Sequence, residues 1–197
     1  TTVLKLMLEQ DYINNEELLN NKSGVFVSIH KFGYLRGCIG TIRSTCNNIA
    51  EEIINNLNLQ PHPEGGYYRQ VYGNDEAGQK KVSTIYYMLR DDEFSAFHRL
   101  HEVVEIWYYH AGEPLDIYVI SPDGTLKIHH LSANGEMQVV IEPECWFAAE
   151  LPHKKGFSFV GCAVAPAFTF DRFELAKKED LQQIYPQHSE LIAKLCR

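Results

Sequence analysis

The segment SAFHRLHEVVEIWYYHAGEPLDI (95–117) brings together histidines and a carboxylate that can do chemistry, namely His98, His101 and Glu105. Residues an even number apart share one face of an extended strand, so His101 and Glu105 can point together, whereas His98 needs a bend to join them. Converging imidazole and carboxylate groups bind transition metals. A carboxylate partner also holds an imidazole ready to act as a base. The segment therefore predicts a metal site or an acid–base site, and a purely structural histidine is the third reading.

A double-glycine turn carries a second set of candidate residues. Glu64, Tyr68 and Arg69 lie in and just after Gly65-Gly66, where the missing side chains let the backbone approach a ligand closely. The guanidinium of arginine matches carboxylate and phosphate groups. We predict that these three residues bind a ligand, with the alternative that Arg69 only pairs with an acidic neighbour.

Aromatic residues at alternating strand positions supply a candidate wall for the same site. Tyr86, Trp107, Tyr109 and Trp146 fit this pattern. Such residues pack in the core of many β-proteins, but an aromatic wall with a few polar tips is also how sugar and base rings are held. We predict that Trp107 and Trp146 bind ligand, and the packing role stays open.

Composition narrows the classes of protein that can present this site. Among 197 residues there are 18 Lys and Arg against 26 Asp and Glu, a net charge of −8, which argues against a nucleic-acid-binding scaffold. No apolar run is long enough to span a membrane, and the start of the chain does not read as a signal peptide. The five cysteines form no CxxC pair, so neither a disulfide framework nor a cysteine zinc site is expected. We predict a cytoplasmic protein.

Proline and glycine mark a boundary at LNLQPHPEGGYY, which predicts two parts, 1–57 and 58–197. In the first part, helical spacing of apolar residues near 3–19 precedes a two-strand unit, GVFVSIHKFGYLRGCIGTI, with a turn at Phe32-Gly33, and a helix in NIAEEIINNL. The first part is thus a small α/β appendage.

The second part is a series of short strands separated by turn signals such as Pro122-Asp123-Gly124 and Asn134-Gly135. Many short strands at near-regular spacing predict an all-β sandwich or barrel. Two helices separated by Pro186 close the chain. The predicted strands are 67–72, 82–90, 95–100, 104–111, 115–121, 125–131, 137–142, 146–151 and 157–165, and the predicted helices are 178–185 and 188–196.

The second part resembles the cupin superfamily. The motif of His-x-His, Glu and Gly is matched at His98, Glu105 and Gly112, but Leu100 stands where the second metal-binding histidine is expected and His101 is one place out of register. In the second motif, PECWFA (143–148), Ala148 replaces the last histidine. The resemblance implies a mainly β cupin jelly-roll barrel in which two of the usual four metal ligands are missing. We therefore expect no bound metal; His98, His101 and Glu105 are the ligands if one is present.

Within that superfamily, runs such as PHPEGGYYRQVY, EIWYYHAGEPL and GFSFVGCAVAPAFTFDRFELA are similar, in order, to an uncharacterised subfamily whose fold resembles that of deoxysugar epimerases. The resemblance implies a pocket in the barrel mouth and a homodimer. In a metal-independent epimerase or isomerase, His98 would remove a proton beside a carbonyl, Glu105 would orient the imidazole, and Tyr86 or Tyr109 would return the proton. The ligand would be a carbohydrate or nucleotide-sugar.

Two other functions stay open, a metal-dependent cupin enzyme and a non-catalytic ligand-binding module. The first part adds a separate resemblance, because LRGCIG (35–40) and the residues around it are similar to the AMMECR family over about residues 4–57. This match is much shorter than that family's domain. We expect the segment to dock onto the barrel or to pair with another subunit.

Overall fold

The computed structural model describes residues 26–31, 34–40, 49–73 and 80–197, and the chain divides into two compact units, Thr1–Asn58 and Leu59–Arg197. In the first unit, β1 (Phe26–Lys31) pairs antiparallel with β2 (Tyr34–Gly40), and α3 (Ile49–Leu57) follows. These are the strands and the second helix expected from the sequence. The expected helix near 3–19 and the turn at Phe32-Gly33 lie outside the described residues.

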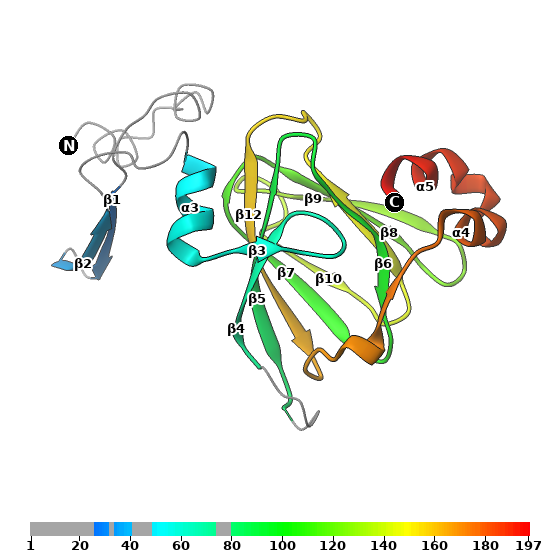
Figure 1. Ribbon diagram of the computed structural model, residues 1–197, viewed down its shortest axis with the longest axis horizontal. Helices are drawn as coiled ribbons and strands as arrows, with labels where there is room; N and C mark the ends of the chain where they lie inside the picture. The colour runs from blue at the N-terminus through cyan, green and yellow to red at the C-terminus, as the bar shows by residue number, and fades with distance from the viewer. Residues whose placement is uncertain (1–25, 32–33, 41–48, 74–79) are drawn as a thin grey trace. The chain divides into compact units, whose positions relative to one another are not determined.

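The second unit consists of short strands followed by C-terminal helices (Figure 1). The helical elements are η1 (Phe170–Arg172), α4 (Lys178–Ile184), η2 (Pro186–His188) and α5 (Ser189–Leu195). The strands are β3 (Gln60–Pro61), β4 (Tyr67–Tyr72), β5 (Ser83–Arg90), β6 (Phe94–Leu100), β7 (Val104–Gly112), β8 (Leu115–Ile120), β9 (Leu126–Leu131), β10 (Gln138–Ile141), β11 (Trp146–Glu150), β12 (Phe157–Ala165) and β13 (Phe173–Leu175).

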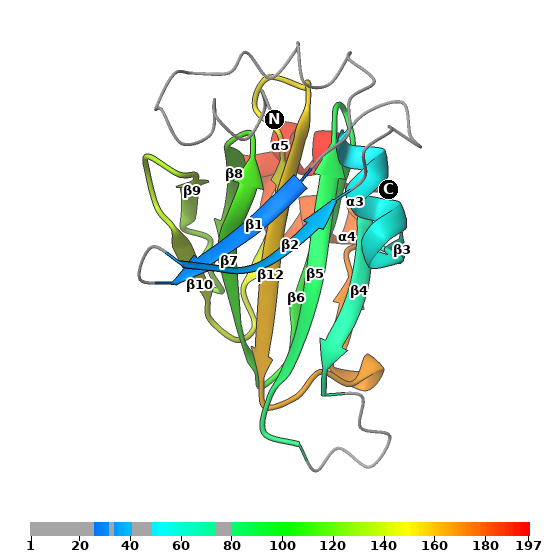
Figure 2. The ribbon, with the colours of Figure 1, turned by 90° about the vertical axis from the view of Figure 1, so that its left-hand side faces the viewer.

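Two antiparallel sheets form the body of this unit. One has the order β10-β7-β12-β5-β4-β3 and the other β13-β6-β11-β8-β9. Figure 2 shows β7, β12, β5 and β4 running side by side in the first sheet. The main core cluster draws on both sheets, with Leu89 and Trp107 from one and Ile117 and Phe147 from the other. The jelly-roll β-architecture with C-terminal helices is therefore confirmed.

Alternation along the strands decides which side chains face this interior. In β7, Glu105 and Trp107 are buried, whereas Tyr108 and His110 are exposed, as expected for residues of opposite parity on a strand. On β6, His98 faces the interior, and Phe97 packs on the outer face with Ile192 and Leu195 of α5. The C-terminal helices thus cover the outer face of the five-stranded sheet, leaving its inner face to the site.

The nine strands predicted for the second part are present with ends that differ by at most one residue, and both C-terminal helices are found. Prediction missed β3 and β13, because elements of two or three residues are too short to show alternation. Their positions matter: β3 precedes the double-glycine turn, and β13 follows an aromatic segment that borders the pocket.

Candidate functional site

The turn between β3 and β4 places a carboxyl group inside the barrel. It is closed by hydrogen bonds from His62 N–H to Gly66 O at 2.9 Å and from Gly65 N–H to His62 O at 3.0 Å. Gly65 has a φ of 119°, and a Cβ there would lie 2.1 Å from the carbonyl oxygen of Phe94. Only glycine fits this close approach. The Ala96 N–H also donates to Glu64 O at 2.8 Å, so the turn is held against β6.

Glu64 and His98 form a buried pair at the centre of the site. Glu64 Oε2 lies 3.0 Å from His98 Nε2, and Ser95 Oγ donates to Glu64 Oε1 at 2.9 Å. His98 Nδ1 lies 2.8 Å from Ala96 O. A carbonyl oxygen only accepts, so Nδ1 carries a proton and Nε2 is the nitrogen that faces the carboxyl group. One proton is therefore shared between Nε2 of His98 and Oε2 of Glu64.

Burial determines where that proton lies. Burial lowers the pKa of His98 to about 4, although the bond to the Ala96 carbonyl opposes this, and burial raises the pKa of Glu64. Both shifts favour the uncharged forms. Both shifts therefore favour the arrangement in which the proton lies on Glu64 and is donated to a neutral imidazole. His62 Nδ1 lies 3.6 Å from Glu64 Oε2, and burial lowers the pKa of His62 as well.

A second carboxyl group, Glu105, faces the same interior from β7. Burial raises the pKa of Glu105 to about 8, and the neighbouring Glu64 adds to the rise. The thiol of Cys162 and the indole of Trp107 lie close enough to oppose it, although Trp107 Nε1 has no partner in good hydrogen-bond geometry among the described residues. Glu105 is therefore a carboxylic acid, able to donate a proton, at neutral pH.

These groups line a pocket with an empty volume of about 730 Å³. Its polar groups include His62, Glu64, His98 and Glu105. The rest of the wall is mostly aromatic and aliphatic: Tyr68, Ile85, Tyr87, Leu100, Trp107, Val164, Phe168, Phe170 and Phe173, with Gln70, Ser83 and Cys162 between them. A largely apolar pocket with a few converging polar and titratable groups is typical of a small-molecule site.

Five of the residues predicted for the site line this one pocket: Glu64, Tyr68, His98, Glu105 and Trp107. The expectation that Glu105 orients the imidazole needs correction, because the carboxyl group in contact with His98 belongs to Glu64. The sequence offered no means to see this, since the contact joins a turn to a strand 34 residues further along the chain.

Both tyrosines predicted to return a proton lie outside the pocket lining. Tyr86 is on the outer face of its strand, with its ring 5.4 Å from Phe159 and 6.1 Å from His110. The hydroxyl of Tyr109 donates to Gly112 O at 2.6 Å. The alternation that turns Tyr87 inward turns Tyr86 outward.

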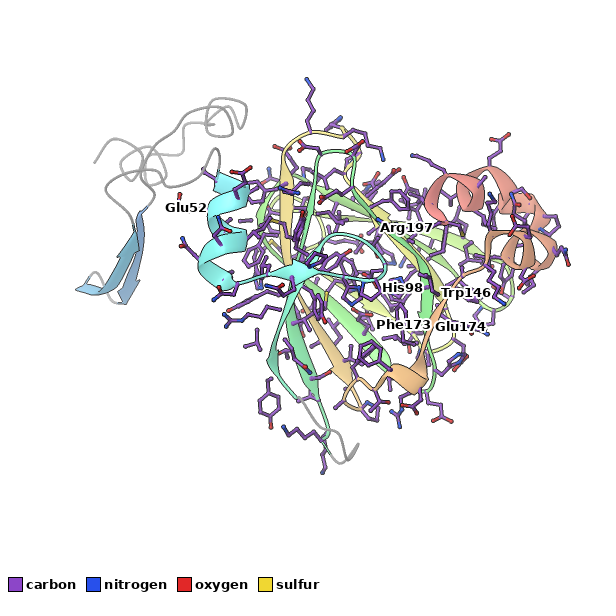
Figure 3. The ribbon with its side chains drawn as sticks, in the orientation of Figure 1. Glu52, His98, Trp146, Phe173, Glu174 and Arg197 are labelled. Atoms are coloured by element: carbon purple, nitrogen blue, oxygen red, sulfur yellow. The ribbon has the colours of Figure 1, made fainter. Side chains whose placement is uncertain are left out.

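Trp146 and Arg69 are also absent from the lining. Trp146 packs with residues of α4 and α5 on the far side of the five-stranded sheet (Figure 3), where Arg99 stacks over its ring at 4.5 Å. Arg69 alternates with Tyr68 and Gln70, both of which line the pocket, and so faces away from it. The predicted ligand contacts of these two residues are not supported by their positions.

The conditional metal set does not come together. His101 is outside the pocket, where Nδ1 lies 2.7 Å from Glu144 and Nε2 lies 3.0 Å from Glu174. Both ring nitrogens of His98 are engaged by the Ala96 carbonyl and Glu64. Across the described ranges, no group of three or more His, Cys, Asp or Glu side chains is arranged to hold a metal ion. The donor set expected for a cupin metal centre therefore does not fit these residues.

Prediction missed several lining residues, above all His62, Cys162 and the aromatic residues of the segment after β12. His62 stands two residues before Glu64, which was the one signal available for it. Phe168, Phe170 and Phe173 follow neither helical nor strand spacing, so periodicity could not assign them a face.

In the parts of the chain described, no helix has the length and apolar character to cross a bilayer.

Comparison with known proteins shows the family to which most of the chain belongs. A family model described as "Cupin superfamily (DUF985)" matches residues 51–176, and an AMMECR1 model matches residues 2–58. A crystal structure of a protein from Shewanella oneidensis is 44% identical with a TM-score of 0.69, covering 75% of this chain and 97% of that one. A hypothetical protein from Leishmania major is 30% identical with a TM-score of 0.67, covering 76% and 99%.

Curated relatives share only short stretches with this chain. A protein from Clostridium acetobutylicum is 63% identical over 46 residues, 23% of this chain and 10% of that protein. A protein from Thermotoga maritima is 47% identical over 51 residues, 25% of this chain and 29% of that protein. The chain therefore spans only a minor part of these relatives. By the family model that covers most of its length, and by its fold, the chain belongs to the cupin superfamily, in the family designated DUF985.

Proposed function

We propose that this cupin is a metal-independent isomerase that moves a proton next to a carbonyl group in a carbohydrate-like substrate. The observation that carries the proposal is the buried His98–Glu64 pair, 3.0 Å apart, which lines one pocket together with protonated Glu105. Titratable groups held uncharged by burial beside an apolar wall are typical of acid–base sites.

The proton inventory of the pocket supports an enolisation. Oε1 of Glu64 accepts the C–H proton while the proton between Oε2 and Nε2 moves onto His98, so the pair becomes an imidazolium beside a carboxylic acid. Glu105 donates its own proton to the carbonyl oxygen and becomes a carboxylate. The C–H electron pair forms the enol double bond, and the two new charges in the protein are opposite and close, which limits the cost of burying them. The pair then returns the proton to the former carbonyl carbon while the Glu105 carboxylate takes the O–H proton of the adjacent hydroxyl group. This gives the isomeric carbonyl compound and restores both groups.

This scheme needs one base and one acid, which is why we favour an isomerase over a two-base epimerase. Tyr86 and Tyr109 are not in the lining, so the second base expected from the epimerase resemblance has no support from them. Tyr68 does line the pocket and favours the epimerase as second candidate. A carbohydrate or nucleotide-sugar ligand remains part of the proposal in either case.

Deuterium exchange tests the chemistry. Aldoses, ketoses and keto-sugar nucleotides are incubated with the full chain in heavy water, and NMR follows exchange at the carbon beside the carbonyl. His98→Gln, Glu64→Gln and Glu105→Gln should each slow exchange by about 10²–10⁴-fold, the usual contribution of a well-placed acid or base. Glu179→Gln, which changes an exposed carboxylate on α4, is the matched control and should exchange normally.

Two outcomes would count against the proposal. Binding of a panel member without any exchange would leave a non-catalytic binding module. A stoichiometric transition metal in the purified chain, lost together with activity in His98→Gln, would support the metal-dependent alternative.

A further inference from the structure

The segment between β12 and β13 forms an aromatic rim on the pocket. Phe168, Phe170 and Phe173 all line the pocket. Phe170 is nevertheless 72% exposed to solvent. Exposing a phenyl group of this size forgoes the hydrophobic free energy of burying it. An exposed aromatic side chain that borders a pocket is therefore a candidate contact for a ligand.

The rings continue from the rim to the reactive groups. Phe170 meets Phe168 edge to face at 5.3 Å, and Phe168 meets Phe173 at 6.2 Å. The ring of Phe173 then lies 5.4 Å from that of His98, and Figure 3 shows these two residues near one another. A ligand lying along this row has its outer end at Phe170 and its inner end at the His98–Glu64 pair.

The backbone of the rim is anchored on both sides of Phe170. At one end, Phe168 N–H donates to Ser83 Oγ at 2.9 Å. At the other, His101 N–H donates to Arg172 O at 2.9 Å, and β13 pairs with β6. Preorganisation of this kind reduces the conformational entropy lost on binding.

We propose that Phe170, supported by Phe168, is a specificity-determining residue that stacks on a planar aromatic ring of the substrate while the reactive carbon reaches His98. The inference deepens the proposed function and rests on it for the identity of the inner site. A nucleobase and an aryl aglycone share the required chemistry, so the substrate is a nucleoside-like or aryl-substituted carbohydrate.

Calorimetric binding to matched probes tests this inference. Phenyl β-D-glucopyranoside is compared with methyl β-D-glucopyranoside, and adenosine with ribose, so that each pair differs mainly by its ring. A ring stacked on Phe170 should tighten binding about three- to tenfold in at least one pair. Preference within the first pair identifies an aryl aglycone, and within the second a nucleobase.

Variants at the rim assign the effect. Phe170→Ala should abolish the preference for the ring-bearing probe and leave binding of the ring-free probe unchanged, whereas Phe170→Tyr should keep the preference. Ile184→Ala removes a comparably exposed apolar side chain on α4, where Ile184 is 59% exposed. This control should change neither the ring preference nor the binding of the ring-free probe. Circular dichroism checks that each variant is folded.

Equal binding of both members in both pairs, an equal loss of both in Phe170→Ala, or binding of neither ring-bearing probe would overturn the inference. Deuterium exchange separates it from the proposed function. Exchange without any ring preference defeats the rim assignment alone, and ring-dependent binding without exchange of any substrate defeats the isomerase alone.

Discussion

At the residue scale, the site is set by two buried carboxyl groups whose pKa values burial raises. Glu64 is satisfied by Ser95 and by His98, so its burial is compensated by hydrogen bonds. Glu105 has less compensation, and burial raises its pKa to about 8. Such a carboxyl group is an acid at neutral pH and a source of instability once it ionises.

The pH dependence of stability follows from the sign of this shift. The folded-state pKa of Glu105 is raised from its ordinary value of 4.5 to about 8, so the folded form holds the proton more tightly than the unfolded chain. Its contribution is fully present below pH 4.5 and is lost as pH rises through 8. Glu105→Gln keeps the uncharged shape and should not lose this contribution.

We therefore compare the unfolding free energy of Glu105→Gln with that of the unchanged protein. The difference, variant minus unchanged protein, should increase by up to about 1.4 kcal/mol per pH unit between pH 5 and 8. Urea titrations at several pH values measure the difference. His98, whose lowered pKa acts in the opposite direction below pH 6.5, is common to both proteins and cancels. A difference that stays flat across this range would show that Glu105 ionises normally.

At the element scale, the rim is fixed by contacts on its outer side. Glu174 of β13 accepts from Arg99 Nε at 2.7 Å and contacts His101 Nε2 at 3.0 Å, while the neighbouring Phe173 lines the pocket. Neighbouring side chains on a strand point to opposite faces, so the ion pairs of Glu174 at the surface help to hold Phe173 in the pocket wall. These ion pairs are partly exposed, so we expect them to order the segment more than they stabilise the whole molecule.

Replacing Glu174 separates the two effects. Glu174→Gln should lower the unfolding free energy by no more than about 1 kcal/mol, because solvent screens both partners. It should nevertheless speed amide hydrogen exchange in residues 170–175, measured by mass spectrometry, and leave β12 protected. Glu179→Gln serves as the control. Unchanged exchange in the rim would mean that pairing of β13 with β6 alone holds it.

At the scale of the whole molecule, the second unit contains everything the proposed chemistry uses. The described buried residues of this unit form three clusters: the main core cluster, the cluster of Phe97 with α5, and a small cluster around Leu100. All three contain only residues after Leu59. The Shewanella relative is covered over 97% of its length by 75% of this chain, so a comparable domain occurs without the remainder. The AMMECR1 model matches residues 2–58, outside the core clusters of the second unit.

We expect a chain of residues 59–197 to fold by itself, because it contains the three core clusters. It should unfold cooperatively, with a midpoint within about 5 °C of the second unit's transition in the full chain. Calorimetry of the two proteins makes the comparison. A non-cooperative or strongly lowered transition would show that the first unit is part of the domain. The homodimer expected from the family resemblance stays a prediction, which a mass measurement in solution can test.

The sequence alone determined the strand series, the C-terminal helices and the presence of His98, Glu105 and the Glu64 turn, because alternation, turn residues and glycine act over a few positions. Residues such as Tyr86, Arg69 and Trp146 were assigned to the site by type, and the strand parity that turned them away depends on which sheet face is covered. Tyr109 shares the parity of Trp107 but packs against the core outside the pocket lining. Tertiary structure decided that Glu64 rather than Glu105 meets His98, and that three phenylalanines border the pocket. Such contacts depend on how two sheets pack across a core. A pattern within a few residues of sequence does not show which side chains meet there.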